Sequence, residues 1–363
     1  KIERTQGRVA FASIEEIIAP SSVRVEPPCP YFGRCGGCDF QQLSYEAQLI
    51  AKVEIIRDCL RRIARIDFPG EIPITPSPDI WRYRSRAQWQ HDPLQMRLGY
   101  FERGTHRVCD VASCPVLVPE LEATLESLRA RMKEGLLPDE VTEFQVVAGD
   151  QGATLTPSLP GQTAREVTRT IADHLYHFDA EGFFQINHGL LEPLIAEATS
   201  GATGRTAVDL YCGAGLFTLP LARAFERVLG VEANARAVHF ARDNAQGARL
   251  DNATFEVSTV AEWLAANGSS LAPVDFVLLD PPRAGVEEGA VKGILALGPR
   301  RISYVSCDPA TMARDLRDFT AGGYGLDAVA AFDMFPQTHH VETVVHLKAL
   351  TYDRTSHIPS PHQ

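Results

Sequence analysis

The stretch Asp209-Leu210-Tyr211-Cys212-Gly213-Ala214-Gly215 decides the fold, because it closes an apolar strand expected over residues 207–211. Its two glycines let a ligand approach the backbone, and the amino terminus of the following helix favours polar or anionic groups. A third glycine at the spacing of dinucleotide-binding loops is missing, since residue 218 is Thr. The stretch predicts a nucleotide-like site and argues against a dinucleotide pyrophosphate.

Around this loop, residues 181–350 alternate between apolar strands and helical patterns. Such alternation predicts a doubly wound parallel sheet of the Rossmann-like α/β class. The last two strands have no helix between them, so an antiparallel hairpin at the edge of the sheet is expected. The expected strands are 207–211, 228–232, 253–257, 274–279, 302–306, 327–332 and 343–347.

Glu232 ends the second of these strands. An acidic side chain at that point accepts hydrogen bonds from both hydroxyls of a ribose. Together with the glycine loop that begins at Asp209, it fits S-adenosylmethionine, which has no phosphate to bind. A tight turn in another α/β fold is the alternative reading of the same residues.

Two further strand ends carry candidate chemistry. Cys307 lies in Ser306-Cys307-Asp308-Pro309, where a helix amino terminus is expected to lower the thiol pKa and make it a nucleophile. A small buried hydrophobic residue is the alternative. Asp280 begins Asp280-Pro281-Pro282-Arg283. An Asp with an Arg fits a ring imide such as the uracil edge, whereas an N-cap followed by turn prolines is the plainer interpretation.

Three of the eight cysteines form a cluster in a glycine-rich loop, Cys29-x5-Cys35-x2-Cys38. Three thiolates at this spacing can wrap a compact metal site whose fourth ligand comes from elsewhere. The spacing alone leaves a four-cysteine zinc site and an iron–sulfur cluster equally open. A thioredoxin-like redox pair is disfavoured, because such pairs open a helix in a βαβ unit.

Taken together, the motifs resemble those of the RNA uracil-5-methyltransferases, in the branch that carries a [4Fe-4S] cluster. The resemblance runs from about residue 23 to 347. Six ordered pieces carry it: the Cys29 to Cys38 cluster with Cys114, Phe184-Gln185-x-Asn187, the Asp209 to Gly215 loop, Asp280-Pro281-Pro282-Arg283, Ser306-Cys307-Asp308-Pro309 and His340-Val341-Glu342.

The resemblance implies a class I methyltransferase domain, a smaller β-rich central domain with a cysteine-bound cluster, and a mechanism. Cys307 would add to C6 of a uracil in RNA, C5 would take the methyl group, and Glu342 would remove the C5 proton. Asp280 would hold the reactants in place. The implied cofactor-binding residues are Gln185, Asp209, Tyr211, Gly213, Gly215, Glu232 and Asp280.

The resemblance also selects [4Fe-4S] over zinc and Cys114 as fourth ligand, with Cys109 as the competing thiol. A structural cluster that shapes the RNA-binding face is expected. This chain departs from many relatives at Leu216 and Thr259, near the methyl donor and its adenine. The leading β-barrel of many relatives is expected to be absent or reduced to a remnant within residues 1–24.

An RNA surface is expected on the central domain. Residues 81–89 alternate with period two, which puts Arg82, Arg84 and Arg86 on one face and aromatic residues on the other. A solvated arginine stripe over an aromatic core is the alternative. Phe183 and Phe184 could stack on a base. Because the target uridine must leave its stack to reach the thiol, single-stranded or loop RNA is expected, ribosomal RNA slightly ahead of tRNA.

The chain has 363 residues, 45% of them hydrophobic, and a net charge of −11. This composition is that of a globular protein and argues against a uniformly basic nucleic-acid coat. No apolar run reaches the length of a membrane span and no secretory signal is evident, so a cytoplasmic monomer is expected. The expected division is 1–24, 25–70, 71–180, 181–350 and a tail at 351–363.

Two rival functions remain at this point. A cytosine-5 methyltransferase shares the thiolate route, and Asp280 alone does not distinguish it. A non-catalytic, metal-stabilised RNA-binding protein would explain the cysteines and arginines. The joint presence of Cys307, Asp280 and Glu342 speaks against that second rival.

Overall fold

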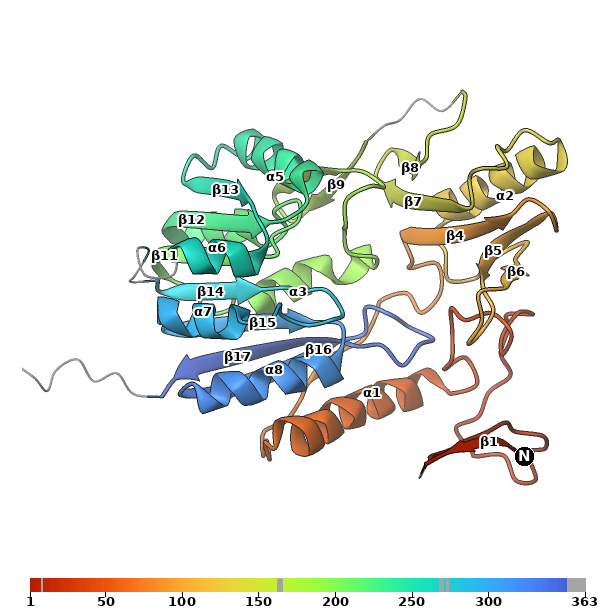
Figure 1. Cartoon of the computed structure of the whole chain (residues 1–363), viewed down its shortest axis with the longest axis horizontal. Coiled ribbons are helices and arrows are strands. Elements are labelled where there is room, and N and C mark those ends of the chain that lie inside the picture. The colour runs from red at the N-terminus through yellow and green to blue at the C-terminus, as the bar shows by residue number, and fades with distance from the viewer. Residues whose placement is uncertain (8, 162–165, 268–270, 272–273, 351–363) are drawn as a thin grey trace, which may run out of the picture.

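An eight-stranded mixed sheet forms the core of the C-terminal part, in the order β13-β12-β11-β14-β15-β17-β16-β3 (Figure 1). The computed structural model describes residues 1–7, 9–161, 166–267, 271 and 274–350. The strands are β11 (Gly204–Leu210), β12 (Phe225–Glu232), β13 (Ala253–Val257), β14 (Phe276–Leu279), β15 (Arg301–Ser306), β16 (Tyr324–Phe332), β17 (Glu342–Ala349) and β3 (Ile74–Thr75).

The predicted parallel sheet with a late antiparallel pair is confirmed, with one correction at its edge. β11 to β15 are parallel, and β17 lies antiparallel between β15 and β16. The hairpin does not end the sheet, because β3 pairs with β16 beyond it. β3 belongs to residues 71–180, which are expected to form the central domain, and it therefore extends the large sheet.

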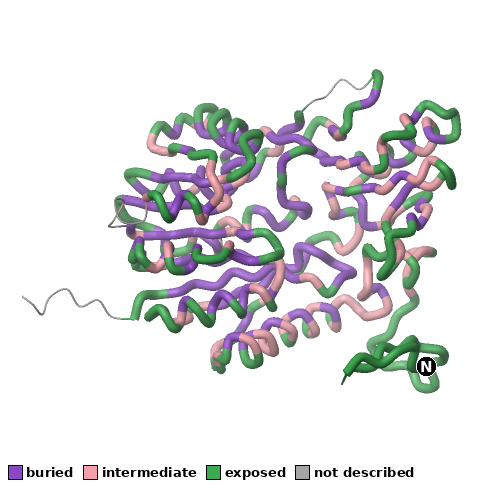
Figure 2. The backbone as a smooth tube through the Cα atoms, in the orientation of Figure 1, coloured by how far each residue is buried: buried purple, intermediate pink, exposed green. Residues whose placement is uncertain are grey.

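Helices cover both faces of the sheet, so its central strands are buried on both sides (Figure 2). One apolar core joins the sheet to α6 (Val260–Asn267), α7 (Ala290–Leu297), α8 (Pro309–Ala321) and α1 (Tyr45–Cys59). The other joins it to α3 (Leu191–Ala198), α4 (Thr218–Ala224) and α5 (Ala235–Gly247). The hairpin of β9 (Val167–Ile171) and β10 (His174–Phe178) and the short helix η2 (His188–Leu190) lie on this second side.

α1 begins at the predicted N-cap, where the Ser44 hydroxyl accepts from the Ala47 amide at 3.4 Å. Ile56, Leu60 and Ala64 are buried, and the helix ends in a π-helical turn, η1 (Leu60–Ala64). α1 and η1 pack on α8. The helix that follows the cysteine loop is thereby anchored on the large sheet.

A second, five-stranded antiparallel sheet has the order β6-β5-β4-β7-β8. Its strands are β4 (Arg86–Asp92), β5 (Arg97–Phe101), β6 (Val108–Asp110), β7 (Glu143–Gly149) and β8 (Gly152–Thr156). α2 (Pro119–Lys133) covers one face through Leu121, Leu125 and Leu128. This unit matches the β-rich region expected there, with β4 starting only at Arg86 because the left-handed Arg82, at φ 54°, breaks the extended run.

The first strands, β1 (Ile2–Gln6) and β2 (Val9–Ala12), form an exposed hairpin. The expected tail at 351–363 lies outside the described residues. Within the described part of the chain, no helix is long and apolar enough to span a membrane.

Candidate active site

The carboxyl ends of the parallel strands β11, β12, β14 and β15 meet at one edge of the sheet, where open α/β sheets hold ligands. Glu232 ends β12, Asp280 follows β14 and Cys307 follows β15. The fold therefore brings three of the predicted site residues to one edge.

The glycine loop after β11 is tightly turned. Tyr211, Gly213 and Gly215 have φ values of 62°, 53° and 87°. The φ of Gly215 lies in the left-handed region, which glycine adopts without strain, and a Cβ there would also lie only 2.9 Å from Leu219 Cδ1. The Gly213 amide donates to Oε2 of Glu232 at 3.2 Å. Glu232 therefore lies against this loop and retains acceptor capacity for a ligand.

Asp209 lies beneath the loop and not on its surface. Its side chain is fully buried and accepts a hydrogen bond from the Thr218 hydroxyl. Burial, together with the negative charges of Asp280 and Glu232, raises its pKa to about 8. Asp209 therefore supports the loop from below through Thr218, and its contact with the methyl donor stays a prediction.

Cys307 and Glu342 are brought together by strand register. β15 and β17 are antiparallel with Ser306 opposite Thr343, so the next residue, Cys307, stands beside Glu342. Glu342 is 1% exposed, and no described residue shares a hydrogen bond with its Oε1. Burial and the charge of Asp280 hold its pKa well above the ordinary value. A buried carboxyl with a raised pKa beside a thiol is the arrangement of a general base next to a nucleophile.

Asp280 completes the group. Gln185 donates from Nε2 to Asp280 Oδ2 at 3.3 Å. Burial raises the Asp280 pKa to about 7, and the Gln185 hydrogen bond opposes that rise. Gln185, Asp280, Cys307 and Glu342 thus form one site, although 157 residues of sequence separate the first from the last.

The expected lowering of the Cys307 pKa is not found. Burial, and then the charges of Glu342 and Asp280, raise it to about 12. These effects outweigh the helix amino terminus, whose first amides are occupied: the Asp308 side chain accepts from the Ala310 and Thr311 amides. Arg283 opposes the rise through its charge and a hydrogen bond.

The sequence predicts that Arg283 pairs with Asp280 at the uracil edge, but it does not predict an effect of Arg283 on Cys307. The Arg283 side chain is exposed and lowers the pKa of both Cys307 and Glu342. The signal that could have found it is its place in a Pro281-Pro282 turn directly after a buried strand. The rigid turn holds a cation next to the thiol.

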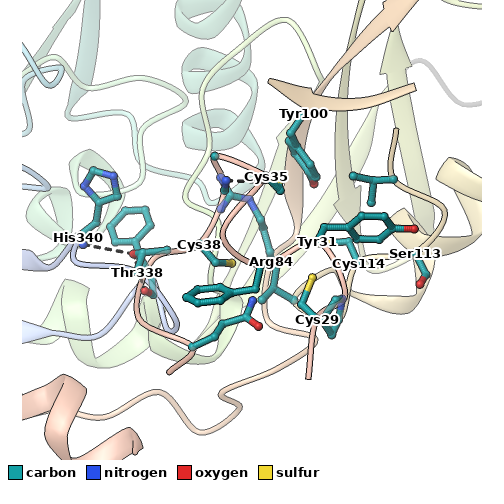
Figure 3. A pocket seen from close by; sticks show the side chains of 18 of the residues that line it. Cys29, Tyr31, Cys35, Cys38, Arg84, Tyr100, Ser113, Cys114, Thr338 and His340 are labelled. Carbon is teal, nitrogen blue, oxygen red and sulfur yellow. Dashed lines mark hydrogen bonds between the residues drawn. The ribbon is translucent and has the colours of Figure 1, made fainter. Parts of the chain in front are cut away.

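The four predicted cysteine ligands line one cavity of about 190 Å³, together with Arg283, Thr338 and His340 (Figure 3). Cys29, Cys38 and Cys114 surround Arg84 in this view. Cys109 is not among the lining residues; it is 1% exposed and accepts a hydrogen bond from Arg34 Nε at 3.3 Å. The cavity therefore favours Cys114 over Cys109 as the fourth thiol.

Within the described residues, no group of three or more His, Cys, Asp or Glu side chains is arranged to hold a metal ion. The chemistry of the donor set nevertheless fits a thiophilic metal, since four thiols share one partly enclosed space. Burial raises the pKa of Cys35 to about 11 and that of Cys114 to about 12.

The candidate RNA-binding residues separate into two groups. Arg82 and Phe183 are exposed, Phe183 by 60%. Arg86 is held internally, donating to the carbonyls of Ala180 and Gly182 at 2.9 and 2.6 Å. The guanidinium of Arg86 is thus already used within the protein.

Phe184 and Arg84 also face inward. Phe184 is 3% exposed and stacks on Phe178 with ring centroids 3.9 Å apart. Arg84 lines the cysteine cavity and donates from Nε to the Arg86 carbonyl at 3.0 Å. Of the expected stripe of three arginines, only Arg82 is fully exposed, whereas Arg84 and Arg86 are partly buried and engaged within the protein. Stacking of Phe184 on a base does not fit its core position.

The chain is similar in sequence to a known family of proteins. Residues 165–350 match the family model described as tRNA (Uracil-5-)-methyltransferase. The chain is 33% identical to the 23S rRNA (uracil(1939)-C(5))-methyltransferase RlmD of Thiobacillus denitrificans, over 94% of this chain and 90% of that protein. It is 30% identical to the enzyme of that name from Vibrio parahaemolyticus, over 93% and 85%.

A solved structure is similar over nearly the whole chain. It is the Pyrococcus abyssi tRNA (uracil-54, C5)-methyltransferase in complex with S-adenosyl-L-homocysteine, with a TM-score of 0.75 and 27% identity. The similarity covers 96% of this chain and 91% of that one.

Proposed function

This chain belongs to the RNA uracil-5-methyltransferase family, and from that premise we propose that it methylates C5 of a uridine in ribosomal RNA with S-adenosylmethionine as donor. The observation that carries the proposal is the strand register that sets Cys307 beside Glu342, with Asp280 in the same site. Ribosomal RNA is preferred because the relatives from Thiobacillus denitrificans and Vibrio parahaemolyticus are named for 23S rRNA.

The reaction begins at Cys307. Uracil C5 is too weak a nucleophile to take a methyl group directly, so the ionised thiol adds to C6 and the electron pair of the C5=C6 bond moves into the C4 carbonyl as an enolate. Arg283 favours the thiolate by its positive charge. Asp280 and Gln185 orient the base.

S-adenosylmethionine supplies an electrophilic methyl group on its sulfonium sulfur. C5 of the enolate bonds to that carbon, and the carbon–sulfur bond breaks with its electron pair left on sulfur. We propose that the donor lies against the glycine loop, with Gln185, Tyr211, Gly213, Gly215 and Glu232 around it. Glu232, beside the loop with free acceptor capacity, is suited to ribose hydroxyls.

Glu342 completes the turnover. It takes the proton from C5, the electrons of that C–H bond restore the C5=C6 double bond, and the C6–S pair leaves with Cys307 as thiolate. A carboxylate whose pKa is held high by burial is a stronger base than an exposed one, which suits this step.

The RNA must present a uridine outside its stack, because the thiol lies at a strand end within a partly buried site. Single-stranded or loop RNA meets that need. Arg82 is available for phosphate contact and Phe183 for stacking on a base. We propose that the chain acts as a cytoplasmic monomer.

Cys29, Cys35, Cys38 and Cys114 would hold a [4Fe-4S] cluster, with zinc as the competing occupant. Support comes from their shared cavity and from the exclusion of Cys109 from its lining. No catalytic step passes through this site. Its neighbours Thr338 and His340 belong to the segment before Glu342, so the cluster would stabilise the wall of the active site.

The test is methyl transfer to unmodified 23S rRNA and to unmodified tRNA, with the methyl group of the donor labelled. The RNA is digested to nucleosides and separated. Label in 5-methyluridine from 23S rRNA alone supports the proposal. Label from tRNA alone would move the substrate class, label in 5-methylcytidine would establish the cytosine enzyme, and no label in either RNA would contradict the activity.

A further inference from the structure

The segment between β16 and β17, residues 333–341, delivers Glu342 to the site. Glu342 is the first residue of β17, and no described residue forms a hydrogen bond with its Oε1. The position of the carboxyl therefore depends on where the backbone enters β17. Whatever holds residues 333–341 also places the base.

Gln337 is the most constrained residue of that segment. It is 2% exposed and has φ 70°, in the left-handed region that a non-glycine residue occupies only when its surroundings enforce it. Its side chain is bound on both sides: Nε2 donates to the Ile80 carbonyl at 3.3 Å, and Oε1 accepts from Gln48 Nε2 at 3.0 Å.

Helix α1 supplies the first set of contacts. Gln48 Oε1 accepts from the Gln337 amide at 2.9 Å, which makes the Gln48–Gln337 pair reciprocal. One turn further on, Lys52 pairs with Asp333 in a fully buried ion pair and donates to the Phe335 carbonyl at 3.0 Å. α1 therefore binds the segment at three points.

The cysteine loop supplies the second set. The amides of Asp39 and Phe40 both donate to the Gln337 carbonyl, at 3.1 and 3.0 Å. The Asp39 carboxylate accepts from the His339 amide at 2.9 Å and also contacts the His339 ring. Since Asp39 directly follows Cys38, the cysteine cavity and the segment before Glu342 share one hydrogen-bonded junction.

We propose that Gln337, held by Gln48 and by the Asp39–Phe40 amides, is a positioning residue that sets the Glu342 carboxyl for removal of the C5 proton. The proposal rests on the proposed function, because it needs Glu342 to be the base. The contacts around Gln337 would then affect only the removal of the C5 proton. Addition by Cys307 and methyl transfer depend on residues that follow β14 and β15 and on the glycine loop after β11, whereas elimination requires Glu342.

If Gln337 positions Glu342, variants that disturb Gln337 should accumulate the covalent Cys307–uridine intermediate. If the base is displaced after the methyl group has moved, the methylated uridine stays bonded to Cys307 through C6. The readout is a denaturant-resistant protein–RNA adduct that carries the labelled methyl group, measured beside steady-state release of 5-methyluridine. A general loss of stability would lower both signals and would not accumulate adduct.

The variants are Gln48→Leu, which removes the reciprocal pair, and Gln337→Gly, which permits φ 70° but removes both side-chain bonds. Glu54→Ala, an exposed position on α1, is the matched control. Glu342→Gln calibrates the adduct. Each protein is used as isolated, with its melting temperature and iron content measured.

For Gln48→Leu and Gln337→Gly we expect turnover lower by about 10- to 100-fold and adduct well above wild type, with Glu54→Ala unchanged. Folded variants with wild-type turnover, or with lower turnover and no adduct, would overturn the positioning role. If Gln337→Gly does not fold, Gln48→Leu decides. A Glu342→Gln protein that forms no adduct, while wild type methylates, would instead refute Glu342 as the base.

Discussion

Gln185 Nε2 donates to Asp280 Oδ2 at 3.3 Å, which ties the segment before α3 to the carboxyl end of β14. Gln185 is 4% exposed, so this contact is shielded from water. The hydrogen bond opposes the rise in the Asp280 pKa that burial causes. It therefore controls both the charge and the orientation of the carboxyl that faces the reactants.

Replacing Gln185 with Ala should raise the Asp280 pKa above about 7, because a bond to the ionised form is lost. With the carboxyl less ionised and less fixed, kcat/KM should fall by about 10- to 100-fold at neutral pH and recover partly at higher pH. Gln88→Ala, an exposed glutamine on β4, is the control. An unchanged pH profile would contradict the role.

Removing the cation at Arg283 should shift the pH dependence of activity upwards. Arg283 lowers the pKa of Cys307 and of Glu342, so Arg283→Ala lets both rise. Cys307 and Glu342 must lose their protons to act, and in this variant they do so at higher pH. The increase of kcat/KM with pH therefore shifts to higher pH. Arg283→Lys retains the charge and should shift less. A downward shift in Arg283→Ala would be inconsistent with this sign.

The positions of the strands could be predicted from the sequence, because strands buried inside a parallel sheet are runs of apolar residues. The strand predicted at residues 302–306, for example, lies within β15 and is buried along its whole length. The two-residue β3 could not be predicted, since Ile74–Thr75 carries no periodic signal. Its place beyond β16 follows from tertiary pairing alone.

A sequence motif was enough to predict which residues form the site. It was not enough to predict their pKa values or contacts, because these depend on packing. Cys307 and Glu342 were found, but the rise in the Cys307 pKa depends on burial that no local pattern encodes. The sequence predicts that Phe184 stacks on a base, but an aromatic side chain also suits a core, and Phe184 packs on Phe178. The contact between Gln48 and Gln337 could not be predicted, because 289 positions separate the two residues in the sequence.

Removing one partner of the buried Lys52–Asp333 pair should strongly lower the stability of the protein. Both side chains are fully buried. Asp333→Ala leaves an uncompensated ammonium group, at a cost of about 3–5 kcal/mol in the free energy of unfolding. Asp58→Ala, which removes the exposed partner of Arg61, should cost less than about 1 kcal/mol. Urea unfolding of both variants compares them, and equal losses would contradict the argument.

The two nearby thiols should differ in their effect on bound metal. Cys114→Ser removes a thiol from the wall of the cavity, so the iron content per chain should fall strongly along with visible absorption. Cys109→Ser lies outside that wall and should retain iron. The reverse pattern would assign the fourth ligand to Cys109, and zinc in place of iron in wild type would replace the cluster.

The central claim is covalent activation of uracil through Cys307, and loss of the C5 hydrogen tests it most directly. Unmodified 23S rRNA carrying tritium at uracil C5 is incubated with protein and S-adenosylmethionine, and tritium released to water is counted. We expect tritium release in step with methylation for wild type and none for Cys307→Ala, which should still bind the RNA. Release by Cys307→Ala at the wild-type rate, or methylation without release, would contradict the claim.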